Sequence, residues 1–471
     1  MTVGQGWLSR GARGAFMCCA LLAGAVLCPR DADAFCGFYV AGSGAQLQNS
    51  GTHVVLMRIG TLTVLSMQND YSGPPADFAM VVPVPVVLQA DDVRTLPRDV
   101  FDRVNALSAP RLVEYWEQDP CASATTAHTS SMSHSIDDLL GRAVAPQPVQ
   151  VHARFAVGEY DVVVLGAGDS AALEQWLRAH GYRIPDGAAA ILRPYVQQGM
   201  KFFVAKVDAS RVRFVGGRAV LSPLRIAYAS QGFSLPVRLG LLNSSGEQDL
   251  IVHILAESRR YEVANYPNVT IPTNLEVQDR TRSAFGSFYE ALFRETLAAS
   301  PGAVVTEYAW SAGSCDPCPG GVMGLSSSDL QTLGMDVLGP SYNLSAYQSR
   351  VVLTRLHHRY APTVLGEDLV FRVGLPIQGG REDTPGNGAS VGGVNAFQAR
   401  YIIRHPYGGR IACDNPRRNM WGPPPSRGWG AATPVVPPGL GAERPAAAAS
   451  SHSFRGSGTP WRTARHARAR P

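Results

Sequence analysis

The feature that most constrains this chain is its N-terminal leader, because the leader decides the compartment in which the rest folds. Two arginines precede the continuous small and apolar run Phe16–Cys28, and a small-x-small motif ends at Ala34. This order is typical of a cleavable secretion signal. We therefore expect residues 1–34 to be removed and the mature, exported protein to begin at Phe35. The run of 13 residues is shorter than the ~20 that a membrane-spanning helix needs, so we expect no stable membrane span afterwards.

The cysteines agree with an oxidising compartment, where paired thiols form disulfides. Five of them follow the leader: Cys36, Cys121, Cys315, Cys318 and Cys413. Because the number is odd, the simplest arrangement is two disulfides and one remaining cysteine. Cys315 and Cys318 form a C-x-x-C motif and are the expected pair. Two of the other three are expected to form the second bond, in a pairing that the sequence leaves open.

The C-x-x-C motif has two other interpretations, a redox-active pair and a zinc site. Redox activity needs a thiolate, which a helix N-terminus stabilises, but Pro319-Gly320-Gly321 follows the motif and argues against a helix there. Zinc needs two further ligands, which only Cys121, Cys413 or His357 could bring from afar. We therefore favour a structural disulfide and predict no metal site.

The net charge of +5 does not indicate a basic binding face. The nine arginines after residue 413 face only two acids, and without this segment and the leader the body has a net charge of −3. We therefore expect no nucleic-acid partner. Residues 423–471 are rich in Pro, Gly, Ala, Ser and Arg, and such a composition predicts a disordered tail.

The body between leader and tail has strand and helix patterns that do not alternate regularly. This mixture predicts a strand-rich α+β fold with several short helices rather than a doubly wound α/β fold. We divide it into a strand-rich part, 35–145, and a second α+β part, 150–422; the alternative is that the two parts form one continuous domain. Within the first part, helices are predicted over Arg98–Leu107 and Arg111–Glu117.

Two further motifs could carry chemistry. Gly166–Ala171 lies between a predicted strand and a predicted helix, as in a dinucleotide-binding loop, but Asp186 follows a segment too short and polar to be the second strand. We expect a loop in which Asp169 or Ser170 caps the helix, and no cofactor. His357 and His358 are adjacent, so they point to opposite faces of a strand. We expect His357 to be packed or hydrogen-bonded, and His358 to face solvent.

Several segments together resemble DUF2330, an exported bacterial family of unknown function. They lie between about residues 35 and 425: Phe35–Val40, Met80–Pro85, Leu173–Pro185, Met200–Val207, Pro236–Val252, Cys315–Cys318, Leu353–Tyr360 and Phe397–Pro406. The resemblance implies a protein of the cell envelope, and it brings no assigned catalytic residue with it.

No catalytic set of residues emerges from the sequence. The leading hypothesis is therefore a non-enzymatic protein of the periplasm, cell envelope or exterior that binds or scaffolds another envelope component. The alternative is a thiol-redox protein that acts through Cys315 and Cys318.

Overall fold

The structure is a computed structural model, and it confirms a strand-rich α+β fold. It describes residues 38–41, 48–72, 78–121, 149–182, 187–215, 218–243, 247–315, 318, 324–338, 344–360, 366–381 and 386–422. The leader, the expected cleavage site between Ala34 and Phe35, Cys36 and the tail 423–471 lie outside the described residues.

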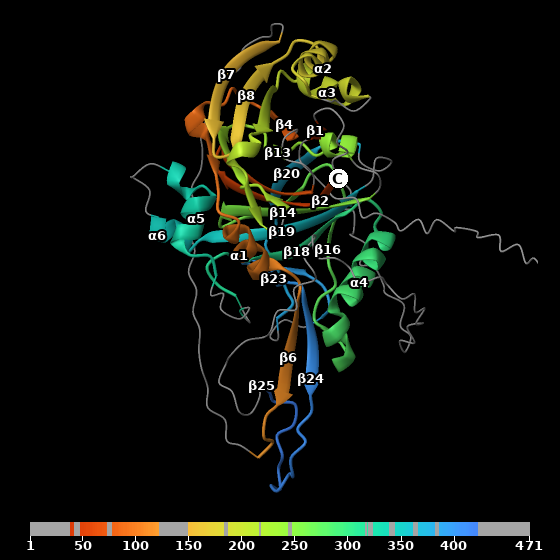
Figure 1. Cartoon of the computed structure of the whole chain (residues 1–471). Coiled ribbons are helices and arrows are strands. Elements are labelled where there is room, and N and C mark those ends of the chain that lie inside the picture. Colours follow the sequence, from red (N-terminus) through yellow and green to blue (C-terminus); the bar gives the residue numbers. More distant parts are fainter. Residues whose placement is uncertain are drawn as a thin grey trace, which may run out of the picture.

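A large mixed sheet of 11 strands forms the centre of the molecule (Figure 1). Its long middle strands are rich in Val, Ile and Leu, which favour extended backbone. β14 runs parallel to β2 and antiparallel to β19. The strand order is β22 (Ser390–Val391), β21 (Ile377–Gly379), β23 (Ala396–Gln398), β18 (Val304–Ser311), β19 (Val351–Tyr360), β14 (Gln248–Glu257), β2 (Gln48–Ile59), β3 (Leu62–Ser72), β12 (Leu224–Ala229) and β5 (Val93–Thr95), with β16 (Asn268–Thr270) beside β18.

A second, antiparallel sheet of five strands packs on one face of the large sheet. Its order is β1 (Phe38–Ala41), β4 (Phe78–Val84), β9 (Lys201–Val207), β8 (Tyr160–Gly166) and β7 (Gln150–Val157). The core between the sheets includes Leu56 and Met80, both fully buried. On the outer face of the second sheet lie α2 (Ser170–Ala179) and α3 (Ala188–Gln197). Asp169 caps α2 by accepting a hydrogen bond from the Ala172 N–H, as the sequence suggested.

The opposite face of the large sheet is covered by helices and by the base of a smaller sheet of four strands, whose far end projects from the body (Figure 1). The helices are α1 (Asp99–Ser108), α4 (Phe285–Ala299), α5 (Ser327–Leu333) and α6 (Leu344–Gln348). The smaller sheet has the order β17 (Leu275–Glu276), β24 (Arg400–His405), β6 (Arg111–Glu117) and β25 (Trp421–Gly422). Both faces of the large sheet are therefore shielded from solvent.

The remaining elements are short. They are the strands β13 (Ser234–Leu235), β20 (Leu369–Gly374), β15 (Arg260–Val263), β10 (Arg213–Val215) and β11 (Arg218–Val220), and the 3-10 helices η2 (Ala90–Asp92), η3 (Ala209–Arg211), η4 (Arg238–Asn243), η5 (Asp279–Ala284) and η6 (Met335–Val337).

Strand pairing joins the two parts of the sequence. β2 and β3 pair with β14 and β12, and β4 pairs with β9. The predicted helix over Arg111–Glu117 is wrong, because this segment is β6 and lies parallel to β24. Its β-branched and aromatic residues suit a strand, and pairing with a strand nearly 300 residues away outweighs the local helical pattern.

Candidate functional site

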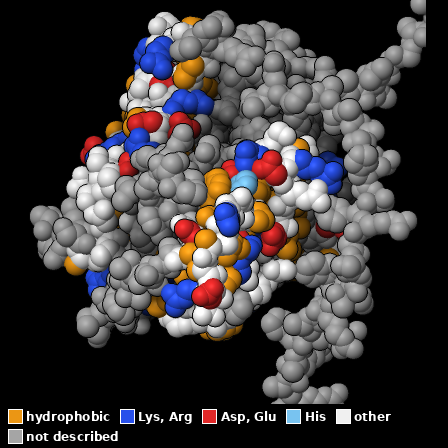
Figure 2. Space-filling model, turned by 90° about the horizontal axis from the view of Figure 1, so that it is seen from below, with side chains coloured by type: hydrophobic (Ala, Val, Ile, Leu, Met, Phe, Trp, Pro, Cys, Tyr) orange, Lys and Arg blue, Asp and Glu red, His pale blue; other side chains and the backbone are white. Residues whose placement is uncertain are grey.

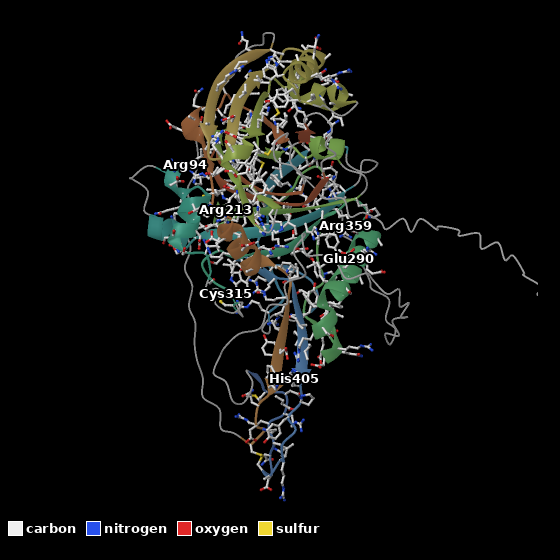
Figure 3. All side chains as sticks on the ribbon, in the orientation of Figure 1. Arg94, Arg213, Glu290, Cys315, Arg359 and His405 are labelled. Carbon is white, nitrogen blue, oxygen red and sulfur yellow. A yellow bond between two sulfur atoms is a disulfide. The ribbon has the colours of Figure 1, made fainter. Side chains whose placement is uncertain are left out.

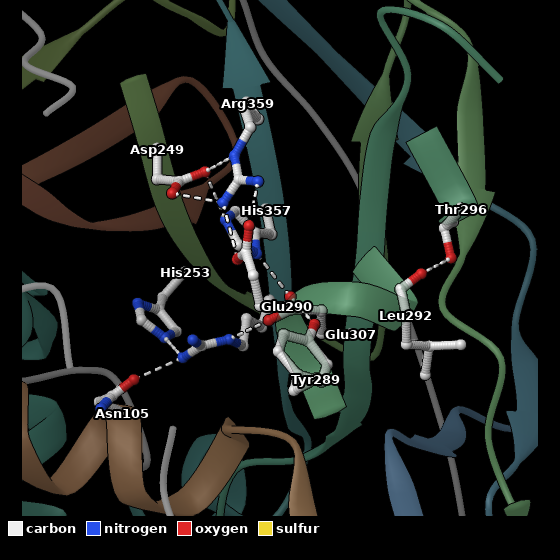
Figure 4. Close-up of polar contacts among 11 residues, drawn as sticks. Asn105, Asp249, His253, Tyr289, Glu290, Leu292, Thr296, Glu307, His357 and Arg359 are labelled. Carbon is white, nitrogen blue, oxygen red and sulfur yellow. Dashed lines mark hydrogen bonds and ion pairs between the residues drawn. The ribbon is translucent and has the colours of Figure 1, made fainter. Parts of the chain in front are cut away.

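A network of buried charged side chains lies where α1 and α4 cover the large sheet (Figure 4). Three of its members, Arg355, His357 and Arg359, alternate along β19 and therefore point to one face. On β14, His253 pairs with Arg355 and Asp249 pairs with Arg359 in the strand register. The two strands thus bring five polar side chains onto one covered face.

Glu307 is the centre of this network. It lies in β18 at a register shift between Thr306 and Tyr308, and such bulges turn side chains out of the regular alternation. Its fully buried carboxylate accepts from the Tyr289 hydroxyl, from Arg355 Nε at 2.5 Å and from His357 Nδ1 at 2.7 Å. Burial opposes ionisation, but the charges of His357 and Arg355 outweigh it and lower the pKa of Glu307 to about 2.

His357 carries the opposite charge. Burial disfavours the imidazolium, but Glu307 and Asp249 outweigh burial and raise the pKa of His357 to about 9. Its Nε2 lies 3.1 Å from Asp249 Oδ1. The His357 ring also stacks on Phe293 of α4 at 4.0 Å between ring centroids, which ties the helix to the sheet.

At the outer end of the network an arginine contacts two carboxylates, whereas at the inner end an arginine contacts two neutral side chains. At the outer end, Arg359 donates to Asp249 at 2.7 Å and to Glu290 of α4 at 2.8 Å (Figures 3 and 4). At the inner end, Arg355 donates to Asn105 of α1 at 2.6 Å and to His253 Nε2 at 3.2 Å. Burial keeps His253 neutral by lowering its pKa well below the usual value.

This network is suited to holding layers together rather than to reacting with a ligand. The side chains of Glu307, Arg355 and His357 are at most 9% exposed, and each of the three is bonded to another member. Removing either partner of such a pair is costly, because the other charge is then left buried without compensation.

The neighbouring histidine shows where the sequence interpretation fails. The prediction that His358 faces solvent is wrong, because His358 is only 1% exposed. It points to the opposite face from His357, as adjacent strand residues must, and there it stacks on Tyr360 at 5.3 Å. Both faces of β19 are covered, so alternation on this strand separates two buried environments. Glu307 and Asp249 were not predicted from the sequence, in which the only signal was the alternation of Arg355, His357 and Arg359 along one strand.

The more accessible candidate site is an arm that projects from the body (Figures 1 and 3). We define the arm as β6, β24, β25, residues 118–121 that follow β6, and the loop 406–420 between β24 and β25. His405, at the end of β24, is labelled on it in Figure 3. The base of the arm packs on α4 through Leu112, Tyr401 and Ile403.

Two stacked pairs lie on opposite faces of the arm. On one face the rings of Trp116 and His405 stack at 4.6 Å, and His405 Nε2 lies 2.8 Å from Glu114 Oε2. On the other face the Arg404 guanidinium lies 4.9 Å from the Trp421 ring centroid. Figure 2, which views the molecule from below, shows hydrophobic side chains interspersed with basic and acidic ones. Trp and Arg are the residues most often responsible for binding energy in interfaces.

A second buried carboxylate, Glu117, gives the tip of the arm its shape. Its side chain is 2% exposed and accepts from Arg418 Nε at 2.7 Å and Nη2 at 2.9 Å. The backbone N–H groups of Tyr407 and Asn419 donate to the same carboxylate at 3.0 and 2.9 Å. The hydrogen bonds from Arg418, followed by those from the backbone, lower the pKa of Glu117 to about 2.

The disulfides follow two different patterns. Cys315 and Cys318 are bonded to each other within the segment after β18. Cys121, at the end of the segment after β6, is bonded to Cys413 in the arm loop, across 292 residues of sequence. Among the described residues, no group of three or more His, Cys, Asp or Glu side chains is arranged to hold a metal ion, and no described helix is long and apolar enough to cross a bilayer.

Comparison with known proteins identifies a family but no activity. A family model described as "Uncharacterized protein conserved in bacteria (DUF2330)" matches residues 30–372, which leaves Phe397–Pro406 and the arm loop outside the matched range. No curated protein matches the chain. The crystal structure of baculovirus P35 is similar over 71% of this chain and 99% of that chain, with 11% sequence identity and a TM-score of 0.28.

Proposed function

The chain belongs to this uncharacterised bacterial family, and we propose that it is an exported cell-envelope protein that binds another envelope component through the arm without catalysing a reaction. The observation that carries the proposal is the arm itself. It extends beyond the packed layers (Figure 1), and its two Trp residues and its arginines have the composition of an interface centre.

Export is supported by the two disulfides and by the leader. Cys121–Cys413 and Cys315–Cys318 need an oxidising compartment to persist. Cell fractionation with immediate thiol alkylation tests this proposal. We expect protein that begins at Phe35, outside the cytoplasm, with four cysteines protected from alkylation. Protein that retains Met1 in the cytoplasm would contradict export and leave the arm to be tested separately.

Binding through the arm can be tested with a photo-reactive amino acid at Ile411 or Met420, which are 37% and 46% exposed. The matched control is Val151 on β7, which is 42% exposed and lies in the five-stranded sheet, outside the arm. In cells that produce the protein, we expect a cross-linked product of one defined mass from both arm positions and none from Val151. Substitution of Trp116 and Trp421 by Ala should abolish it. Equal products from all three positions, or none from the arm, would refute the proposal.

The thiol-redox alternative predicts a different result. The first described helix after Cys318 is α5, which begins at Ser327, so the pair does not lie at the start of this helix. We therefore propose that Cys315–Cys318 is a structural bond. An insulin-reduction assay separates the alternatives, because only a redox protein would lose activity when both cysteines are replaced by Ser.

A further inference from the structure

The arm loop has very little buried surface of its own. Pro406, residues 408–412 and residues 414–420 are exposed, and only Tyr407 and Cys413 are partly buried. The hydrophobic effect, which stabilises most of the protein, therefore contributes little to the conformation of this loop. Its shape must depend on specific ties to the rest of the arm.

All of the described bonds that tie the arm loop to the rest of the protein, whether hydrogen bonds, the ion pair or the disulfide, lead to one short segment, residues 117–121. The noncovalent ones are the Glu117 carboxylate, the Gln118 N–H bonded to the Met420 carbonyl at 2.7 Å and the Arg417 N–H bonded to the Pro120 carbonyl at 2.8 Å. The covalent one is Cys121–Cys413. Cys413 lies between the noncovalent ties at Tyr407 and at Arg417–Met420, so the disulfide holds the middle of the loop.

The disulfide is accessible to a reductant, because Cys121 is exposed at the surface and Cys413 is partly exposed. By contrast, both cysteines of the second disulfide are partly buried, and Cys315 packs against a hydrophobic core cluster. A thiol that attacks a disulfide must reach one sulfur directly. The arm disulfide is therefore the one that an external thiol reaches more readily.

We propose that Cys121–Cys413 is a redox latch: the disulfide holds the arm loop in its binding conformation, and its reduction releases the loop. This inference rests on the proposed function. The reductant is a dithiol, either of a thioredoxin-like protein or of a small molecule. Its thiolate attacks one sulfur to form a mixed disulfide and releases the other cysteine as a thiolate, which takes up a proton. The second thiol of the reductant then displaces the first cysteine, so two electrons pass to the protein and the reductant becomes a disulfide.

Limited trypsin digestion tests the latch, because Arg410 and Arg417 are exposed cleavage sites on either side of Cys413. We expect Cys121→Ser/Cys413→Ser to be cut at these sites about tenfold faster than the wild type, as local opening controls cleavage. Dithiothreitol should have the same effect on the wild type. The control Cys315→Ser/Cys318→Ser, which lacks the other disulfide, should be cut at the wild-type rate.

The cross-link from Ile411 separates this inference from the proposed function. If the latch is correct, the cross-linked product forms with oxidised wild type and with the Cys315→Ser/Cys318→Ser control, and disappears in Cys121→Ser/Cys413→Ser. If the product forms equally in all three, or if trypsin cuts the Cys121→Ser/Cys413→Ser loop no faster, the latch is wrong and the binding proposal stands. If oxidised wild type gives no product while trypsin shows the expected opening, the binding proposal fails and the conformational latch stands.

Discussion

Glu307 and Glu117 are two buried carboxylates with similar chemistry and different surroundings. Each collects three or more hydrogen bonds, and each has a pKa lowered to about 2. Glu307 binds side chains from α4 and β19 and so connects the layers of the body. Glu117 binds Arg418 and two backbone N–H groups of one exposed loop. We therefore expect loss of the Glu307 carboxylate to affect the whole fold, and loss of the Glu117 carboxylate to affect a local surface.

The largest effect on global stability should come from Glu307→Gln. The substitution keeps the side-chain shape but leaves Arg355 without its buried counter-charge and His357 with Asp249 alone, and such a loss costs about 3–5 kcal/mol. Urea unfolding followed by circular dichroism measures the change. The control is Glu290→Gln, because Glu290 is 23% exposed and Arg359 keeps Asp249 as a partner. Equal stability losses in the two variants would show that burial of Glu307 is not decisive.

Alkaline pH should weaken the same network. The folded-state pKa of His357 is about 9 against an ordinary value of 6.5, so its stabilising contribution is fully present below pH 6.5. The contribution declines as pH rises and is lost above about pH 9, with a total of about 3 kcal/mol. Unfolding free energies measured between pH 6.5 and 9.5 should show this decline. His357→Asn should remove most of the pH dependence; an unchanged slope in that variant would assign it to other groups.

These two regions also differ in how far the sequence predicted them. The strand-rich α+β class followed from β-branched runs, and α2 with its Asp169 cap followed from local spacing and capping chemistry. The Glu307 network did not, because it depends on a bulge in β18 and on the register between β14 and β19. The arm did not, because β6 pairs with a strand from the far end of the body, and the local pattern of Arg111–Glu117 suggested a helix instead.

A smaller effect is expected when Cys315 and Cys318 are both replaced by Ser. The disulfide closes a loop with a sequence separation of only 3 residues, and the gain from closure grows with loop length, so we expect a loss of ~1–2 kcal/mol. Urea unfolding measures it. A loss as large as that of Glu307→Gln would mean that this bond holds more of the fold than its own segment.

The smallest global effect should come from Glu117→Gln, and here the structure predicts a local change instead. The backbone N–H groups of Tyr407 and Asn419 both donate to the carboxylate, and a neutral amide is a weaker acceptor than a carboxylate. Hydrogen exchange at these two amides should therefore become several-fold faster, while the urea midpoint stays near that of the wild type.

Glu114→Gln is the matched control for Glu117→Gln, because Glu114 also lies on β6 but accepts from His405 and Arg282 on the other face of the arm. It should leave the Tyr407 and Asn419 amides protected. The pKa of Glu117 is lowered from an ordinary value of 4.5 to about 2. The stabilising contribution of its carboxylate is therefore fully present above about pH 4.5, declines as the pH falls, and is gone below about pH 2. A large fall in the urea midpoint of Glu117→Gln at neutral pH would mean that the arm supports the body. It would also remove the distinction between the two carboxylates, since both would then hold the fold as a whole.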